Sequence, residues 1–215
     1  MMRDAITRNA LVLSLFAIGT AAMLALTNRQ TLPQIECNRE QALQGSLVEV
    51  MPAQRFDNTL LADAVRVSDP LLGRGEHWVY RARQGNDPAG LVLEAVAPDG
   101  YGGAIRLLVG VDTAGVLTGV RIIPPHNETP GLGDAIDVRK SDWITRFTGR
   151  SLDNPKQGGW AVKKDGGEFD AFTGATITPR AVVTAVHRTL QYVQREQDTL
   201  FALPAARLHE GHCDD

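Results

Sequence analysis

The feature that most constrains the fold is an apolar run near the N-terminus. No charged residue occurs for 20 positions between Arg8 and Arg29. A helix of that length, rising 1.5 Å per residue, matches the hydrocarbon core of a bilayer. Arg3 and Arg8 precede the run, and this charge bias favours a cytoplasmic N-terminus and an exported remainder. We therefore expect a cytoplasmic segment at residues 1–8 and a transmembrane helix at residues 9–28.

A cleaved signal peptide is the alternative interpretation of the same run. The run is longer than the apolar core of a usual signal peptide, and no small-x-small cleavage site clearly follows it. Cys37 does not fit a lipidated cysteine either, because polar residues precede it and the apolar run has already ended. These observations favour an uncleaved anchor.

The rest of the chain predicts an α+β domain with an antiparallel sheet packed with helices. A short helix is expected at residues 38–51, ending before Pro52. Alternating apolar residues predict strands at residues 77–83, 91–96, 104–111 and 116–123. Short turns join these strands, so an antiparallel meander is expected and a doubly wound nucleotide-binding fold is not. Further along, we expect a short helix at residues 142–147, a strand at 160–164 and a turn at 165–168.

Charge and cysteine content exclude several classes of function. The chain has 22 basic and 25 acidic residues, and no long basic run suggests nucleic acid as a partner. Its two cysteines, Cys37 and Cys213, do not form a C-x-x-C pair. We therefore expect no metal site or iron–sulfur cluster on this chain alone. A disulfide between the two cysteines is left open by the sequence.

A polar turn followed by a helix is expected near residue 176. Residues 170–180 read Asp-Ala-Phe-Thr-Gly-Ala-Thr-Ile-Thr-Pro-Arg, and apolar residues then recur at helical spacing to about Glu196. Thr178 is the expected N-cap and Pro179 the expected first helical residue. The backbone donors of the helix start, with Arg180 in the first turn, suit a phosphate. An ordinary helix start would show the same spacing.

Three blocks in this chain resemble those of a known family. Asp170, Thr173, Gly174, Ala175 and Thr176 match the motif Asp-x-x-Ser/Thr-Gly-Ala-Thr of FMN-binding domains, whose last threonine carries FMN through a phosphoester. Two upstream blocks follow the family's order: residues 100–103 read Gly-Tyr-Gly-Gly, and residues 126–133 read His-Asn-Glu-Thr-Pro-Gly-Leu-Gly. The run from 160 to 186 is similar to the G subunits of Rnf-type (Rsx-type) ion-translocating electron-transport complexes.

The resemblance implies a cofactor and a set of site residues. FMN would be bound covalently to Thr176, attached by a separate flavin transferase that recognises the motif around it. Arg180 would lie near the phosphate, and no residue would have a catalytic role of its own. Further candidates for contact with the flavin are Tyr101, His126, Glu128, Thr129 and Leu132. The implied covalent FMN-binding domain spans residues 76–196, between a post-anchor helix and connecting segment at 29–75 and a C-terminal tail at 197–215.

The resemblance also implies a function. The chain would be a membrane-anchored flavoprotein subunit that relays electrons in an Rnf-type complex, coupling electron transfer between ferredoxin and NAD to ion translocation. Its partners would be the other membrane and peripheral subunits, and it would cross the bacterial inner membrane once, with most of the chain on the periplasmic side. We expect no turnover from the chain alone. The alternatives are the FMN-carrying subunit of a sodium-translocating NADH:quinone reductase, which tends to be longer than 215 residues, and an anchored structural subunit without redox function.

Overall fold

The computed structural model describes residues 2–206. Within them lie helix α1 (Met2–Val50), helix α2 (Ile177–Ala202), a five-stranded sheet and several short 3-10 helices. The chain divides between Leu43 and Gln44 into a helical N-terminal part and a compact C-terminal domain. Cys213, whose pairing with Cys37 the sequence leaves open, lies outside the described residues.

Helix α1 contains the predicted membrane span. Among the described residues, one helix is long and apolar enough to cross a membrane, and it covers Ile6–Val50. Residues 38–50 are helical and the helix ends before Pro52, as predicted, but they do not form a short helix of their own, because α1 runs without interruption through Pro33 to Val50. Proline removes a single backbone donor from the helix, and no glycine-rich turn interrupts the chain there.

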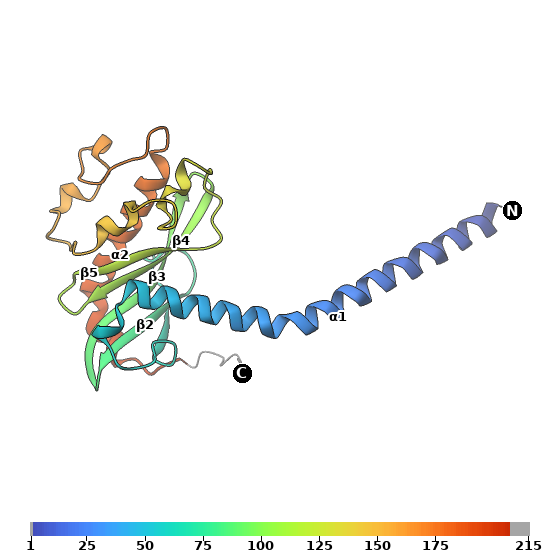
Figure 1. Cartoon of the computed structure of the whole chain (residues 1–215), viewed down its shortest axis with the longest axis horizontal. Coiled ribbons are helices and arrows are strands. Elements are labelled where there is room, and N and C mark those ends of the chain that lie inside the picture. The colour runs from blue at the N-terminus through green and yellow to red at the C-terminus, as the bar shows by residue number, and fades with distance from the viewer. Residues whose placement is uncertain (1, 207–215) are drawn as a thin grey trace. The chain divides into compact units, whose positions relative to one another are not determined.

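The C-terminal domain is built on an antiparallel meander (Figure 1). Its strands lie in the order in which they occur along the chain: β1 (Ala64–Val67), β2 (His77–Gln84), β3 (Asp87–Gly100), β4 (Gly103–Asp112) and β5 (Leu117–Ile123). The four predicted strands are confirmed as β2 to β5. Strand β1 was missed because four residues are too few to show an alternating pattern.

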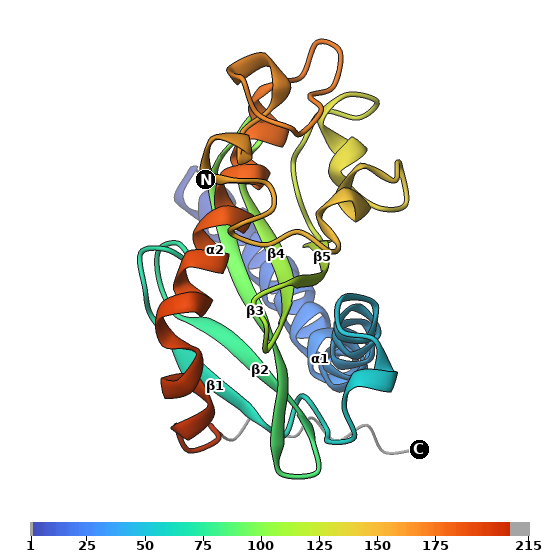
Figure 2. The same ribbon diagram turned by 90° about the vertical axis from the view of Figure 1, so that its left-hand side faces the viewer.

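Helix α2 packs along one face of the sheet, mainly against β3 and β4 (Figure 2). Alternate strand residues such as Leu93 and Val109 point into this layer, where they meet the apolar side of α2. The helix contributes the residues whose spacing predicted it: Val182, Val183, Val186, Leu190 and Val193. Its predicted end near Glu196 was wrong, since Leu200 is also buried in the core and the helix continues to Ala202.

The opposite face of the sheet receives the last turn of α1 through glycine positions on β4 and β5. A Cβ atom on Gly110 would lie 2.7 Å from the carbonyl oxygen of Val50, and one on Gly119 would lie 3.1 Å from the same oxygen. Such a close approach of backbone to backbone requires glycine. The Thr118 hydroxyl donates to the Val50 carbonyl oxygen at 2.7 Å, which fixes this contact.

Residues 124–176 form an irregular region at one end of the sheet, coloured yellow to orange in Figures 1 and 2. The short helix predicted at residues 142–147 is present as a 3-10 helix over Trp143–Phe147. An aromatic cluster holds the region together, with Phe147 and Phe169 stacked at a centroid distance of 4.7 Å and Trp160 beside them. The other 3-10 helices here cover Gly133–Ile136, Gln157–Gly159 and Lys163–Asp165.

The strand predicted at residues 160–164 was wrong. The chain folds back on itself at this point: Lys163 N–H donates to the Phe169 carbonyl at 2.7 Å, and Gly167 N–H donates to the Val162 carbonyl at 3.1 Å. A Cβ atom on Gly167 would lie 1.9 Å from the Ala161 carbonyl oxygen. The glycines therefore permit a tight loop, confirming the turn expected at 165–168 but leaving no room for a strand.

Candidate functional site

The motif that begins at Asp170 folds into a turn that leads directly into α2. Ala175 N–H donates to the Phe172 carbonyl at 3.0 Å, which places Thr173 and Gly174 at the tip of the turn. Gly174 has a φ of +80°, a backbone conformation that favours glycine. The turn tip is exposed, and Thr176 follows it at the boundary with the helix.

Thr176 occupies the N-cap position of α2, but its side chain makes no capping hydrogen bond. The first N–H groups of a helix lack acceptors within the helix, and the helix dipole favours negative charge at this end. Thr176 therefore combines a hydroxyl that is not used for capping with a backbone arrangement suited to a phosphate.

The prediction that Thr178 caps the helix was wrong. Thr178 is the second residue of α2, it is buried, and its hydroxyl donates to Oε2 of Glu128. Pro179 is the third helical residue rather than the first; it is tolerated there because the N–H groups of the first turn need no intrahelical acceptor. The sequence correctly indicates a helix start near this point, but the Thr178 hydroxyl donates to the distant Glu128 and does not cap the helix.

A cavity of about 220 Å³ opens beside Thr176. Three segments that are distant in the sequence form its wall: the β3–β4 turn, the loop after β5 and the start of α2. Seven lining residues are among those predicted from the sequence, namely Tyr101, Glu128, Thr129, Leu132, Gly174, Ala175 and Thr176. The other lining residues are Gly133, Ile177 and Thr178. Gly133 closes the second predicted block, Thr178 was expected only as a helix cap, and Ile177 had no predicted role.

Glu128 ties the three segments together. Its Oε1 accepts a hydrogen bond from Gly102 N–H at 3.0 Å, and its Oε2 accepts one from the Thr178 hydroxyl. A Cβ atom on Gly100 would lie 2.8 Å from Oε1, and one on Gly133 would lie 2.7 Å from Oε2. The glycines of the two upstream blocks therefore make room for this buried carboxylate.

Asp170 does not line the cavity. Lys163 Nζ lies 2.6 Å from its carboxylate, Arg146 also donates to it, and the Trp143 indole N–H donates to its main-chain carbonyl at 2.8 Å. The hydrogen bond from Lys163 lowers the pKa of the Asp170 carboxyl, and Arg146 adds to this effect. These contacts fix the start of the turn that carries Thr176.

Arg180 lies beside the cavity but is directed elsewhere. Its guanidinium binds both carboxylate oxygens of Asp165, at 2.6 and 2.9 Å, and this hydrogen bonding lowers the pKa of Asp165. Arg180 and Ile177 also line a neighbouring cavity of about 200 Å³ that includes Arg188. In this arrangement the Arg180 side chain does not reach the space next to Thr176.

His126 and Thr173 also lie away from the cavity wall. His126 Nε2 is 3.9 Å from a carboxylate oxygen of Asp137, and neither His126 nor Thr173 is among the residues that line the cavity. Asp137 is itself hydrogen-bonded by Arg139, which lowers its pKa. Sequence matching alone could not distinguish these supporting positions from those that face the cavity.

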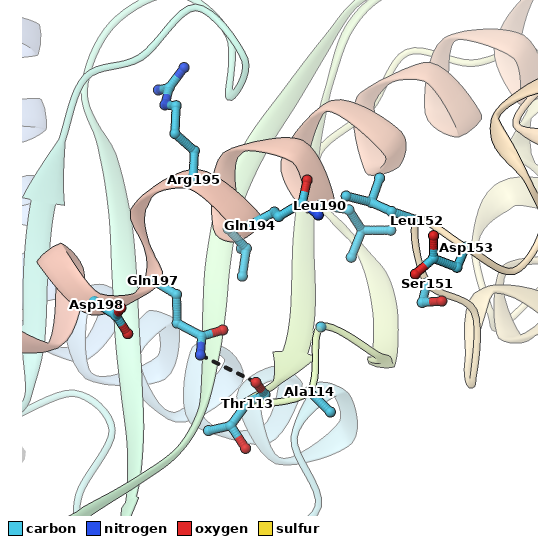
Figure 3. Close-up of a pocket in the computed structure, with 12 residues that line it drawn as sticks. Thr113, Ala114, Ser151, Leu152, Asp153, Leu190, Gln194, Arg195, Gln197 and Asp198 are labelled. Atoms are coloured by element: carbon cyan, nitrogen blue, oxygen red, sulfur yellow. Dashed lines mark hydrogen bonds between the residues drawn. The ribbon is translucent and has the colours of Figure 1, made fainter.

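A larger cavity of about 320 Å³ lies elsewhere along α2 (Figure 3). It is bounded by the β4–β5 connection, residues 151–153 and the C-terminal half of the helix, where the Gln197 side chain donates to the Thr113 carbonyl at 3.3 Å. Because it contains none of the motif residues, its size alone does not make it the candidate site.

The smaller cavity suits a ligand that has a phosphate and a flat ring. Thr176 and the helix start offer a hydroxyl and backbone donors, while Leu132, Ile177 and Tyr101 are exposed side chains that could cover a ring. Gly133 and Gly174 keep the wall free of side chains at two points. These residues fit FMN, the cofactor that the resemblance implies.

Comparisons with known proteins identify two family matches and several similar proteins. Residues 100–191 match the family described as FMN-binding domain, and residues 1–50 match the family described as RnfG N-terminal region. The chain is similar to the G subunit of the ion-translocating oxidoreductase complex of Escherichia coli, with 48% identity over 204 residues, covering 95% of this chain and 98% of the relative. The protein of the same name from Shewanella loihica is 46% identical over 95% of this chain and 97% of its own length. That from Salmonella typhi is 44% identical over 100% of both chains.

Proposed function

Because this chain belongs to the family of G subunits of ion-translocating oxidoreductase complexes, we propose that it is a membrane-anchored FMN subunit that relays electrons within such a complex. One observation carries the proposal. The FMN-binding-domain match includes the cavity residues from Tyr101 to Thr178, and among them Thr176 has a hydroxyl at the helix start that makes no capping hydrogen bond. FMN supplies the redox chemistry when bound, while the protein supplies its position and electrostatic surroundings.

The cofactor is held covalently, through a phosphoester to Thr176. A flavin transferase supplies it from FAD: the bond between the Thr176 oxygen and the FMN phosphorus forms, the bond to AMP breaks, and the hydroxyl proton leaves with AMP or solvent. The exposed turn tip at Thr173 and Gly174 makes the motif accessible to such an enzyme. A covalent bond prevents loss of the cofactor by dissociation where free FMN is scarce.

Different residues serve this site in different ways. The start of α2 stabilises the negative charge that remains on the phosphodiester, an effect worth about 0.3–1 kcal/mol near a surface. Tyr101, Leu132 and Ile177 would cover the ring, and Asp170 fixes the turn through Lys163 and Arg146. Arg180 and His126 act indirectly, since their side chains contact Asp165 and Asp137 instead of the cavity.

The N-terminal helix anchors the protein in the membrane. One N-terminal candidate span fits a single-pass protein of the inner membrane. In the proposed topology residues 1–8 are cytoplasmic, the apolar part of α1 contacts lipid, and the FMN-binding domain lies on the periplasmic side. The other subunits of the complex are its partners in electron transfer.

The decisive experiment is to replace Thr176 with valine in the full chain, produced together with a flavin transferase. Valine removes the hydroxyl at nearly constant size, so the mass increment of FMN and the fluorescence of the denatured protein should disappear. Thr184→Val is the matched control, because the Thr184 hydroxyl donates to the Arg180 carbonyl within α2 and is absent from the cavity wall. That variant should keep the flavin.

The two parts of the proposal fail in different ways. Covalent flavin that persists in Thr176→Val would move the attachment to another residue, such as Thr173. A wild-type chain that carries no flavin despite an active transferase would reject the cofactor assignment itself.

A further inference from the structure

The strongest unexplained feature of the site is the buried carboxylate in its wall. Glu128 is 5% exposed and lines the cavity beside Thr176. Its two hydrogen-bond partners, Gly102 N–H and the Thr178 hydroxyl, both donate to it. Among the described residues, no lysine, arginine or histidine forms an ion pair with it.

Both hydrogen-bond partners of Glu128 are groups that can donate to an ionised carboxylate. A backbone N–H can only donate, so the oxygen facing Gly102 must act as an acceptor. Hydrogen bonds to a charged acceptor are stronger than those between neutral groups, and here they replace part of the lost hydration. An ionised Glu128 would have no ion-pair partner among the described residues, and burying an unpaired charge is costly to folding.

A neutral side chain would hold the same three segments together at a lower cost. A glutamine could accept from Gly102 N–H and donate to the Thr178 oxygen, because a hydroxyl can also accept. The requirement for geometry alone therefore does not explain why a charged residue stands at this position. The charge has a consequence for any redox group held in the same cavity.

We infer that Glu128 is ionised and that its carboxylate lowers the reduction potential of the FMN bound at Thr176. The inference rests on the proposed function. One-electron reduction adds one negative charge to the flavin ring, and a fixed negative charge in the cavity wall opposes that addition. Since the cavity is small and partly shielded from water, the repulsion is weakly screened compared with that between surface charges.

The other residues that line the cavity do not offset a negative charge on Glu128. Thr129, Leu132, Gly133 and Ile177, which line the cavity with it, carry no charge. Two cations that flank the motif in the sequence, Arg180 and Lys163, are bound to Asp165 and Asp170. Glu128 is thus the one charged side chain among the lining residues that the structure describes.

The test is a spectroelectrochemical titration of the full chain in detergent, with its covalent FMN. Glu128→Gln removes the charge but can keep both hydrogen bonds, so the midpoint potential should shift to a more positive value. Thr178→Val is the matched control, because it removes one hydrogen bond and leaves the charge in place. Its potential should stay unchanged or become more negative. If Glu128 only held the loops in place, its replacement by glutamine would not raise the midpoint potential while Thr178→Val left it unchanged or lowered it.

A second pair of variants keeps the test decisive if Glu128→Gln does not fold or does not acquire flavin. Thr129→Asp adds a carboxylate to the same wall, and Thr129→Asn adds a neutral side chain of similar size. The aspartate variant should have the more negative potential of the two. An unchanged or more negative potential in Glu128→Gln, or equal potentials in the Thr129 pair, would overturn the inference. Absence of flavin from the wild type would instead reject the proposed function.

Discussion

Arg81 offers the sharpest test of how the far end of α2 is held. Its side chain is 3% exposed and pairs with Asp63. Its Nη1 donates to the carbonyl oxygens of Leu200, at 3.0 Å, and of Leu203. The last carbonyls of a helix have no donors within the helix, so a buried cation at this point satisfies them and complements the helix dipole.

Arg81→Met removes these donors while keeping much of the apolar stem. Breaking a buried ion pair costs about 3–5 kcal/mol. The Asp63 side chain is 20% exposed and keeps Arg83 as a partner at 2.6 Å, so the lower end of that range, about 3 kcal/mol, applies here. At about 2–4 °C per kcal/mol for a protein of this size, the melting temperature should fall by about 6–12 °C.

The measurement is thermal unfolding of the full chain in detergent, followed by near-ultraviolet circular dichroism. Arg66→Met is the control, because the Arg66 and Glu76 side chains pair at 3.0 Å while 56% and 62% exposed. An exposed pair contributes about 0–1 kcal/mol, so this variant should lose at most about 4 °C. If Arg81→Met melts no lower than Arg66→Met, the argument that Arg81 stabilises the end of α2 is refuted.

Two further predictions concern pH and topology. His187 stacks on Trp160 at a centroid distance of 5.2 Å, and burial lowers its pKa below 6.5. Protonation therefore favours the unfolded chain, so the contribution of His187 to stability is present above pH 6.5 and declines as the pH falls below 6.5. His187→Phe should reduce the fall in melting temperature below pH 6.5, and an unchanged slope would exclude this histidine as the cause. A reporter that is active only in the periplasm should be active when fused after Leu60, whereas activity of a cytoplasmic reporter at that point would reverse the proposed orientation.

Local patterns predicted most of the fold because most of its elements have local causes. The alternation in residues 91–96 and 104–111 corresponds to the core side of β3 and β4. The three- and four-residue spacing after Pro179 likewise corresponds to the apolar side of α2. The errors occur where distant contacts decide the outcome. Arg81 interacts with the last turn of α2 from more than 100 positions away, and no helix-stop rule includes such a partner.

The candidate site was predicted as a set of motifs but not as a geometry. Three separated blocks supply the cavity wall, and their order along the chain says nothing about which side chains face inward. Glu128 and Thr178 are 50 positions apart, so the hydrogen bond between them could not be read from either block. Arg180 shows the converse case. Its position in the first turn suggested a phosphate ligand, but its guanidinium is bound to the carboxylate of Asp165 and does not line the cavity.

The position of Thr176 on α2 explains why a helix start suits a relay cofactor better than a free loop. Electron transfer requires a fixed distance between redox groups, and a site on a rigid element supported by surrounding contacts is more precise than one on a loop. Here the helix packs along the sheet, Arg81 holds its C-terminal end, and Glu128 binds its first turn through Thr178. A flavin esterified to Thr176 would be connected to this rigid helix by a single phosphodiester. The same contacts that stabilise α2 would thereby limit the motion of the cofactor relative to the domain.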